Sequence, residues 1–443
     1  MSPVADHASS SELITDIEQF LIRALEECVP PEPLRTPWVL GRRRTLHELH
    51  LWLAVLLTVV RGSVSQTAVW RFLFTASVSR YTPIVISDES VFRRLGTAGT
   101  AVLERLFATV LAILTDRLAP LIAQQGPPLA PFAADVVGLD ETTFDKVARK
   151  IPTLRGVPKK DHRLLPGKLA GVFDVRHQLW RRVLRIEHAN QNEKVAARSL
   201  LDGLARGTLI LADLGYFAFR WFDELTAAGF FWVSRVRAKA SFVPIHTFFA
   251  QGETRDELVW VGAYRADQAR FQARLVQFKV RDHCYQYLTN VLDPRVLPLA
   301  DIARLYARRW DIEMAFNLVK THLDLHALWS AKQDVLWIQV WAVLIVSQIL
   351  QAMRWEIAVR AGVDVFDVSL PLLVKYASSA AARGENVVDW FVRDGKKLHF
   401  IRPARRVRLD LPIIPAEAIV PAPPHLLGER QPRYANKQRT SAT

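Results

Sequence analysis

The sequence predicts an α/β protein in which a layered region of strands and helices is flanked by helices on both sides. Residues 10–118 carry apolar positions at the three- and four-residue spacing of helices. From about residue 134, short β-rich runs alternate with helical segments, as in α/β layered folds. Helical periodicity returns from Leu299 to about Ser379. These observations divide the chain into a helical domain at 1–125, an α/β domain at 126–335, and C-terminal helices with a basic tail at 336–443.

The N-terminal domain consists of amphipathic helices, predicted at 12–27, 47–61 and 96–118. The segment 86–95 has a Ser/Asp cap with acids in its first turn, followed by two arginines and a leucine. With a helix at 67–75 it forms either a helix-turn-helix that touches DNA or part of an ordinary helical bundle. The prolines Pro127, Pro128 and Pro131 mark the boundary of the next domain.

The α/β domain begins with a short apolar strand at 136–139, and a hairpin follows at 169–175 and 179–186, with its turn at 176–178. A helix at 193–204, a strand at 208–212, a helix at 219–228 and a strand at 230–236 come next. Residues 258–264, 271–280 and 284–290 are again strand-like. Because they lie between the α/β run and the next helix, we interpret about 238–296 as a β-rich insertion.

The charge of the chain indicates a polyanionic partner. The formal net charge is +14 and the pI is about 10.0, which favours nucleic acid, although a basic protein can also be basic for solubility alone. With only Cys28 and Cys284, neither a disulfide scaffold nor a cysteine-ligated zinc site is expected, which fits a reducing cytoplasm. Residues 1–20 lack the basic-then-apolar order of a signal peptide. The apolar stretch 335–350, interrupted by Gln339 and Gln348, predicts a buried helix and no membrane partner.

The helix predicted around residues 305–320 carries a polar stripe. If Tyr306 defines zero and each residue advances about 100°, Arg309 lies at about 300°, Lys320 at about 320° and Glu313 at about 340°. Asp311 lies at about 140°, away from this stripe. The geometry therefore selects Glu313 over Asp311 as a candidate functional acid. A surface face with an Arg309–Glu313 ion pair at i,i+4 is the alternative.

Two aspartates follow strand-like runs upstream. Asp140 ends the run at 136–139, and Asp213 ends the run at 208–212. If these strands are parallel neighbours, the two carboxylates meet at one sheet edge, where Glu313 can complete a three-carboxylate site. Such a site suits Mg²⁺, and two ions suit phosphodiester displacement. A turn or helix cap is the alternative for each aspartate alone. Competing acids are Asp135, Glu141, Asp145 and Asp223.

The spacing Tyr306-x2-Arg309-x3-Glu313-x6-Lys320 matches the Y-(2)-R-(3)-E-(6)-K signature, so the chain resembles the bacterial insertion-sequence transposases of the DDE superfamily. The sequence GLDET at 138–142 resembles the block with that family's first aspartate. LADLGY at 211–216 resembles the block with the second, and YLTN at 287–290 resembles the strand before the catalytic helix. The resemblance covers about 134–330 and is weaker on either side.

The resemblance implies a ribonuclease-H-like catalytic core with the β-rich insertion before the Glu helix, and a DNA-binding N-terminal domain. It implies that Asp140, Asp213 and Glu313 bind two Mg²⁺ or Mn²⁺ ions, and that Tyr306, Arg309 and Lys320 contact DNA phosphates. Family members cut at transposon ends, often through a hairpin intermediate, and join the ends to target DNA.

Three further regions bear on DNA binding. The family commonly has a small residue or Ser where this chain has Glu141, which either joins the metal site or, as strand alternation favours, points away. The basic segment 146–168, with Lys159, Lys160 and Arg163, is expected to track DNA near the metal site rather than to be a plain solvated loop. The basic tail beyond residue 400 either binds DNA or is merely flexible.

Three hypotheses follow. The first is an insertion-sequence transposase that binds terminal inverted repeats in double-stranded DNA, cuts them and transfers the ends to target DNA, as a homodimer when assembled on DNA. Such a protein would be bacterial, cytoplasmic and nucleoid-associated. The alternative is a catalytically silent or domesticated DNA-binding derivative. A nuclease that cuts without joining is the third, and the Tyr/Arg/Lys stripe argues against it because simple hydrolysis has less need to clamp an end.

Overall fold

The computed structural model describes residues 17–29, 46–63, 65–78, 81–143, 168–186, 193–263, 267–330, 332–383, 385–404 and 411–434. These residues form two compact units. The helical unit is drawn from Met1–Gly126, Thr143–Pro166 and Ala315–Arg405, and the sheet unit from Pro127–Thr142, Gly167–Met314 and Arg406–Thr443. The division into three consecutive domains made from the sequence stays a prediction.

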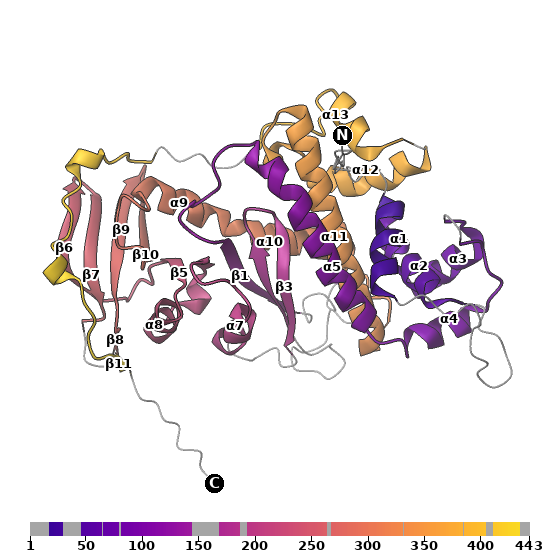
Figure 1. Ribbon diagram of the computed structural model, residues 1–443, viewed down its shortest axis with the longest axis horizontal. Helices are drawn as coiled ribbons and strands as arrows, with labels where there is room; N and C mark the ends of the chain where they lie inside the picture. Colours follow the sequence, from indigo (N-terminus) through magenta and orange to yellow (C-terminus); the bar gives the residue numbers. More distant parts are fainter. Residues whose placement is uncertain are drawn as a thin grey trace, which may run out of the picture. The chain divides into compact units, whose positions relative to one another are not determined.

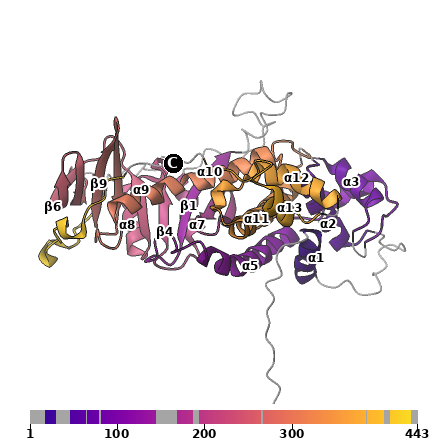
Figure 2. The same ribbon diagram turned by 90° about the horizontal axis from the view of Figure 1, so that it is seen from above.

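The sheet unit is built on a mixed sheet of nine described strands, in the order β3-β2-β1-β4-β5-β10-β9-β7-β6. Figure 1 labels β6, β7, β9, β10, β5, β1 and β3 across the unit, and Figure 2 shows β6, β9, β4 and β1 from above. The strands are β1 (Val136–Thr143), β2 (Lys168–Asp174), β3 (Leu179–Ile186), β4 (Leu209–Ala212), β5 (Phe231–Arg235), β6 (Phe242–Gln251), β7 (Thr254–Val261), β9 (Gln272–Val280) and β10 (His283–Thr289). β1, β4 and β5 are parallel, which confirms the predicted α/β class with a large mixed sheet.

The two faces of the sheet carry separate apolar cores, because successive side chains of a strand point to opposite faces. One core joins Val137 and Ile210 to α7 (Glu193–Leu201) and α8 (Phe219–Ala227). The other joins Val136 and Leu209 to α9 (Leu299–Arg308). β4 is buried along its whole length, as expected of a central parallel strand.

The strands of the predicted insertion extend this same sheet, since β10 pairs antiparallel with β5 and β9 pairs with β7. β6, which has mixed exposure, was not among the strands identified from the sequence. The C-terminal segment 411–434 lies on these strands and pairs β11 (Arg433–Tyr434) with β8 (Asp267–Gln268). Arg430 donates to the carbonyls of Val261, Gly262 and Ala269, at 2.8–3.1 Å. This part of the basic tail is therefore an ordered strap.

The helical unit is centred on α11 (Gln333–Ala361). Its helices are α1 (Ile17–Cys28), α2 (Glu48–Val60), α3 (Gln66–Thr75), α4 (Asp88–Leu95), α5 (Ala101–Ala123), α11, α12 (Leu370–Ala382) and α13 (Val387–Asp394). Of these, α11 packs against α2, α4, α5, α12 and α13.

In the described residues, α5 and α11 are long and apolar enough to cross a membrane. The apolar window of α11 is 94% buried inside the protein, as in a core helix, whereas that of α5 is 28% buried.

The predicted cap of α4 is present, because the Ser87 side chain accepts a hydrogen bond from the Ser90 amide. Residues 76–87 join α3 to α4, whereas the turn of a helix-turn-helix has about 3–4 residues. Trp70 Nε1 fastens this connection by donating to the Ile86 carbonyl at 2.8 Å. The long connection favours the bundle interpretation of these helices over a helix-turn-helix.

Candidate active site

Asp140 and Asp213 lie at matching positions of two neighbouring parallel strands, at one edge of the sheet. β1 and β4 are parallel, with Val136 opposite Leu209 and Gly138 opposite Leu211. Continuing this register by two residues sets Asp140 opposite Asp213. Both residues then share the face that carries α9, because side chains alternate along a strand. The apolar runs of these two strands therefore lead both carboxylates to the same side of the same edge.

Glu313 reaches this edge from α10 (Trp310–Asn317). Gly138 allows a close approach of the helix, since a Cβ on this glycine would lie 3.5 Å from Cγ2 of the fully buried Ile312. Arg309 Nη2 donates to Glu313 Oε1 at 2.5 Å, and Arg309 Nε lies 3.9 Å from Asp213 Oδ1. The three predicted acids are therefore brought together within the sheet unit.

The electrostatics of Asp140 reflect this convergence. Burial, together with the charges of Glu313 and Asp213, raises the pKa of Asp140 to about 6, against a hydrogen bond from the Glu141 amide and the charge of Arg309. The amide bond, 2.8 Å long, holds Oδ1 of Asp140. Within the described residues, the charge of Arg309 lowers the pKa of Asp140 but does not offset burial and the two neighbouring acids.

This donor set fits a divalent metal ion. Mg²⁺ and Mn²⁺ prefer carboxylate oxygens, and they commonly take ligands from carboxylates together with water and phosphate oxygens. The side chains of Asp213 and Glu313 are 42% and 31% exposed, so ligands can reach them. An ion here would also relieve the repulsion that raises the pKa of Asp140.

Tyr306 and Arg309 add hydrogen-bond donors beside the acids. The Tyr306 hydroxyl and the Nε and Nη1 atoms of Arg309 are buried and make no hydrogen bond within the described residues. Burial raises the pKa of Tyr306 to about 12, so its hydroxyl keeps its proton at neutral pH. Buried donors without partners are costly in a protein, and a phosphate oxygen would satisfy them.

Arg235 is a further cation at this edge that the sequence analysis did not identify. β5 is parallel to β4, with Ala212 opposite Ser234, so Arg235 is level with Asp213. Arg235 is exposed, and its charge acts on the pKa of Tyr306. The pattern that could have revealed it is the strand predicted at 230–236, because two neighbouring parallel strands end at the same edge.

The remaining signature residue, Lys320, belongs to the helical unit. It lies in a π-helical turn, Leu318–His322, and its ammonium is 5.9 Å from the centre of the Phe316 ring. The α-helical angle of about 100° per residue does not apply in such a turn. A shared stripe with Glu313 therefore stays a prediction. Lys159, Lys160 and Arg163 lie outside the described residues, as does Asp145.

The competing acids have other partners. Asp223 accepts the amides of Arg270 and Phe271, at 2.7 and 3.1 Å, and so anchors the start of β9. Glu141 Oε2 lies 3.0 Å from Lys168 Nζ, and the two side chains are 5% and 11% exposed. This buried ion pair agrees with the expectation that Glu141 points away from Asp140.

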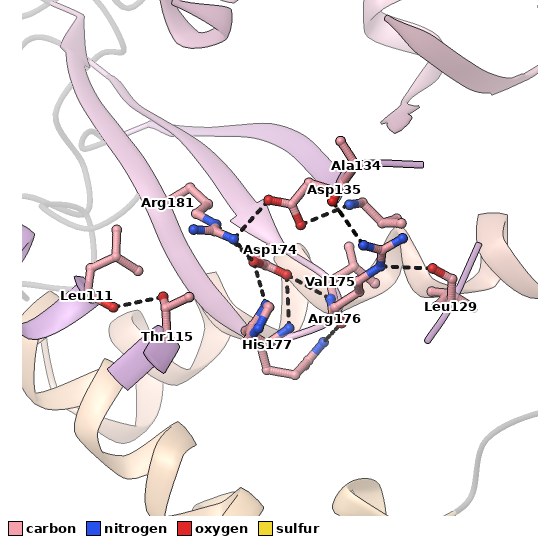
Figure 3. A network of polar contacts seen from close by, with 12 residues as sticks. Leu111, Thr115, Leu129, Ala134, Asp135, Asp174, Val175, Arg176, His177 and Arg181 are labelled. Atoms are coloured by element: carbon pink, nitrogen blue, oxygen red, sulfur yellow. Dashed lines mark hydrogen bonds and ion pairs between the residues drawn. The ribbon is translucent and has the colours of Figure 1, made fainter. Parts of the chain in front are cut away.

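A second acidic cluster, Asp135, Asp174 and His177, has ligand atoms within 4.8 Å of one another (Figure 3). It adjoins the first residue of β1, whereas Asp140 lies in the middle of that strand, which continues to Thr143 and not, as predicted, only to Leu139. Arg181 Nη2 lies 2.8 Å from Asp135 Oδ2 and 2.7 Å from Asp174 Oδ2. Burial and the charge of Asp174 raise the pKa of Asp135, but Arg181 already pairs with both acids, so a metal ion would have to compete with this guanidinium.

Comparison with known proteins identifies the class to which this site belongs. Residues 148–349 match the family described as "Transposase DDE domain". A protein of Sinorhizobium fredii (strain NBRC 101917 / NGR234), named "Putative transposase y4zB", is 24% identical over 214 residues. The match spans 47% of this chain and 59% of that relative's length. A cryo-EM structure of "piggyBac transposase synaptic complex with hairpin DNA" aligns over 92% of this chain and 85% of that one, with 10% identity and a TM-score of 0.42.

Residues 148–349 are therefore similar to the transposase DDE domain, and the resemblance of the chain to the DDE transposases of insertion sequences is confirmed. The matched range includes Asp213 and Glu313 and begins after Asp140. Proteins of this family act on DNA in transposition and use divalent metal ions.

Proposed function

We propose that this chain is the transposase of an insertion sequence, which binds terminal inverted repeats, cuts the DNA there and transfers the 3′ ends to target DNA. The observation that carries the proposal is the convergence of Asp140, Asp213 and Glu313 at one sheet edge, in a chain whose residues 148–349 are similar to the transposase DDE domain. The catalytic core is proposed to be ribonuclease-H-like, with the β-rich strands as its insertion. The active assembly is proposed to be a homodimer on DNA, bacterial and nucleoid-associated.

In this proposal, Asp140, Asp213 and Glu313 hold two Mg²⁺ or Mn²⁺ ions. Bound at this edge, such ions would activate the attacking oxygen and stabilise the leaving oxygen of a phosphodiester. The surrounding residues orient the strand: the Tyr306 hydroxyl and the Arg309 guanidinium donate to phosphate oxygens, and Arg235 attracts the backbone from the neighbouring strand end.

Arg309 has two functions in this arrangement. One nitrogen, Nη2, fixes the Glu313 carboxylate, while Nε and Nη1 keep hydrogen-bonding capacity for DNA. A bidentate guanidinium suits this double contact, whereas the point charge of a lysine does not. The basic segment with Lys159, Lys160 and Arg163, together with Lys320, is proposed to extend the phosphate contacts.

The test is cleavage of a plasmid that carries both ends of the element, in Mg²⁺ or in EDTA. Wild type should excise the element only with Mg²⁺, and Glu313→Gln should reduce excision to background while binding of an end fragment persists. Asp301→Asn is the matched control, because Asp301 is an exposed acid on α9 that pairs with Arg304. The control should cleave like wild type.

Tight binding of the ends without Mg²⁺-dependent cleavage by wild type would contradict the proposal. That result would favour the catalytically silent or domesticated DNA-binding derivative. Cleavage without joining of the released ends to target DNA would instead favour a nuclease. Full cleavage by Glu313→Gln would remove Glu313 from the catalytic set.

A further inference from the structure

The turn of the β2–β3 hairpin, Asp174 to Gln178, is held by a buried polar network (Figure 3). The fully buried Asp174 accepts the amides of Arg176 and His177 at one oxygen, both at 2.9 Å. Its other oxygen contacts His177 Nδ1 at 2.8 Å and Arg181 Nε at 2.9 Å. Gln178 ends the turn in the left-handed region, with φ of 61°. The turn is therefore fixed by its own side chains.

The network extends in one direction to the segment before β1. Arg181 bridges Asp174 to Asp135, which directly precedes the strand. The Arg176 guanidinium donates at 2.6–3.1 Å to the carbonyls of Leu129, Ala130, Ala133 and Ala134. These bonds tie the hairpin turn to the start of the strand that later carries Asp140.

In the other direction the turn reaches the start of α10. Gln178 Nε2 donates to Asp311 Oδ2 at 2.9 Å, and Arg308 Nε donates to the same oxygen at 2.6 Å. Gln178 Nε2 and Arg308 Nη2 both also donate to the Val175 carbonyl, at 2.8 and 2.9 Å. The Asp311 side chain has no exposed surface. Asp311 is thus an anchor, which explains why it points away from Glu313.

The anchor matters because the hydrogen bonding of the helix changes directly before it. Between α9, which ends at Arg308, and α10, which begins at Trp310, Arg309 keeps helical backbone angles, but its amide bonds to the Tyr306 carbonyl three residues back. The rotation of α10 relative to α9 therefore differs from that of a regular α-helix at this point. Two contacts in the first turn of α10 directly precede Glu313. Ile312 packs against Gly138, and Asp311 accepts a hydrogen bond from Gln178.

We propose that Gln178 and Asp311 are positioning residues that hold α10 at the rotation where Glu313 meets Asp140 and Asp213. The inference rests on the proposed function in that the three acids are taken as the metal site. Neither residue touches DNA or metal in this account. They act through the helix backbone, as outer contacts do when they orient metal ligands.

The test measures Mn²⁺ binding to the full chain by the loss of the free-ion electron paramagnetic resonance signal, and cleavage as a function of Mg²⁺ concentration. Gln178→Glu sets a carboxylate against Asp311 at nearly constant volume, and Asp311→Asn removes the accepting charge. Each change should weaken Mn²⁺ binding between about 10- and 100-fold and raise the Mg²⁺ needed for half-maximal cleavage, while binding of an end fragment in EDTA stays unchanged. Asp301→Asn should behave like wild type in all three measurements.

The exchange Gln178→Glu with Asp311→Asn gives a donor at 311 and an acceptor at 178, so it should recover most of the lost Mn²⁺ affinity. If Gln178 and Asp311 had a purely structural role, the single variants would have a lower unfolding free energy, and the double variant would not regain Mn²⁺ affinity. Equal Mn²⁺ affinity in wild type and both single variants would overturn the inference, as would a double variant no better than the worse single one. If wild type binds Mn²⁺ but does not cleave, weaker binding by the variants still supports the positioning role, and the proposed function alone fails.

Discussion

Asp140 shows most directly how the site differs from an ordinary strand end. Its carboxylate is half-buried, and its pKa of about 6 follows from burial and from the nearby charges of Glu313 and Asp213. In the unfolded chain the same group has a pKa near 3.8. The folded protein therefore holds a charge that destabilises it in the absence of a cation, a common cost of functional sites.

This cost predicts a pH-dependent effect of Asp140→Asn. Above pH 6 the wild-type carboxylate is ionised in both states, and the charge costs more in the folded one. Stability should thus increase as the pH falls through 6 towards 4, because the folded protein takes up the proton first. In EDTA at pH 8 the Asn variant should be more stable by roughly 1–2 kcal/mol, less than the full shift implies, since water screens a partly exposed group.

Urea unfolding of wild type and variant at pH 8 and pH 4.5 measures this difference, which should become smaller at the lower pH, where the folded protein is largely protonated at Asp140. Adding Mg²⁺ at pH 8 should stabilise wild type and leave the variant unchanged, because the ligand is missing. An Asn variant that is less stable than wild type at pH 8 would mean that the Asp140 charge is compensated within the protein.

The sequence pointed to Asp140, Asp213 and Glu313, and it missed the residues that support them. Strand ends and helix spacing made these three acids candidates among several, the family resemblance singled them out, and their role as metal ligands stays a prediction. The buried function of Asp311 could not be identified, because its partner Gln178 lies far away in the sequence and is brought close only by the β2–β3 turn. For the same reason Arg235 became visible only once β5 was known to lie beside β4.

At the scale of elements, the contact between α10 and β1 decides where Glu313 lies. The sequence predicted helices from 299 to about 379, and the structure adds a change of hydrogen bonding at Arg309, a π-helical turn at Leu318–His322 and the start of α11 at Gln333. Apolar periodicity does not reveal such local changes, because it reports which face of a helix is buried and not how the helix is hydrogen-bonded. The helix docks at Gly138, the one residue of β1 without a side chain.

Substitutions at Gly138 should show whether the close approach of α10 to β1 determines cleavage activity. A Cβ at this position lies at ordinary contact distance from Ile312, so Gly138→Ala should leave cleavage and stability nearly unchanged. Gly138→Leu requires α10 to move away, and should cost about 1–3 kcal/mol in unfolding free energy and most of the cleavage activity. Urea unfolding and plasmid cleavage measure the two effects. A Leu variant with wild-type cleavage would show that the approach of α10 to β1 does not set the position of Glu313.

At the scale of the molecule, the α/β class was predictable and the sheet order was not. Short runs such as β4 are recognisable as buried strands, but their pairing depends on contacts between distant residues. The insertion strands therefore looked separate, although they continue the same sheet. The strap 411–434 was expected from its composition to be a basic tail, because sequence does not show that Arg430 bonds three carbonyls.

The two acidic clusters of the sheet unit differ in charge balance, and this difference underlies the whole account. Burial raises the pKa of Asp174, but hydrogen bonds and charges from His177 and Arg181 outweigh it and hold the pKa below its usual value. Further along β1, Asp140 has its pKa raised. Metal should therefore choose Asp140, Asp213 and Glu313 over Asp135 and its neighbours.

The most direct measurement replaces Mg²⁺ by Fe²⁺, adds ascorbate and peroxide, and maps where radicals formed at the bound iron cut the polypeptide. The account predicts cuts close to residues 140, 213 and 313, suppressed by excess Mg²⁺ and absent in Glu313→Gln. Cuts near residues 135, 174 and 177, or a pattern unchanged by Glu313→Gln, would contradict a metal site at the three converging carboxylates.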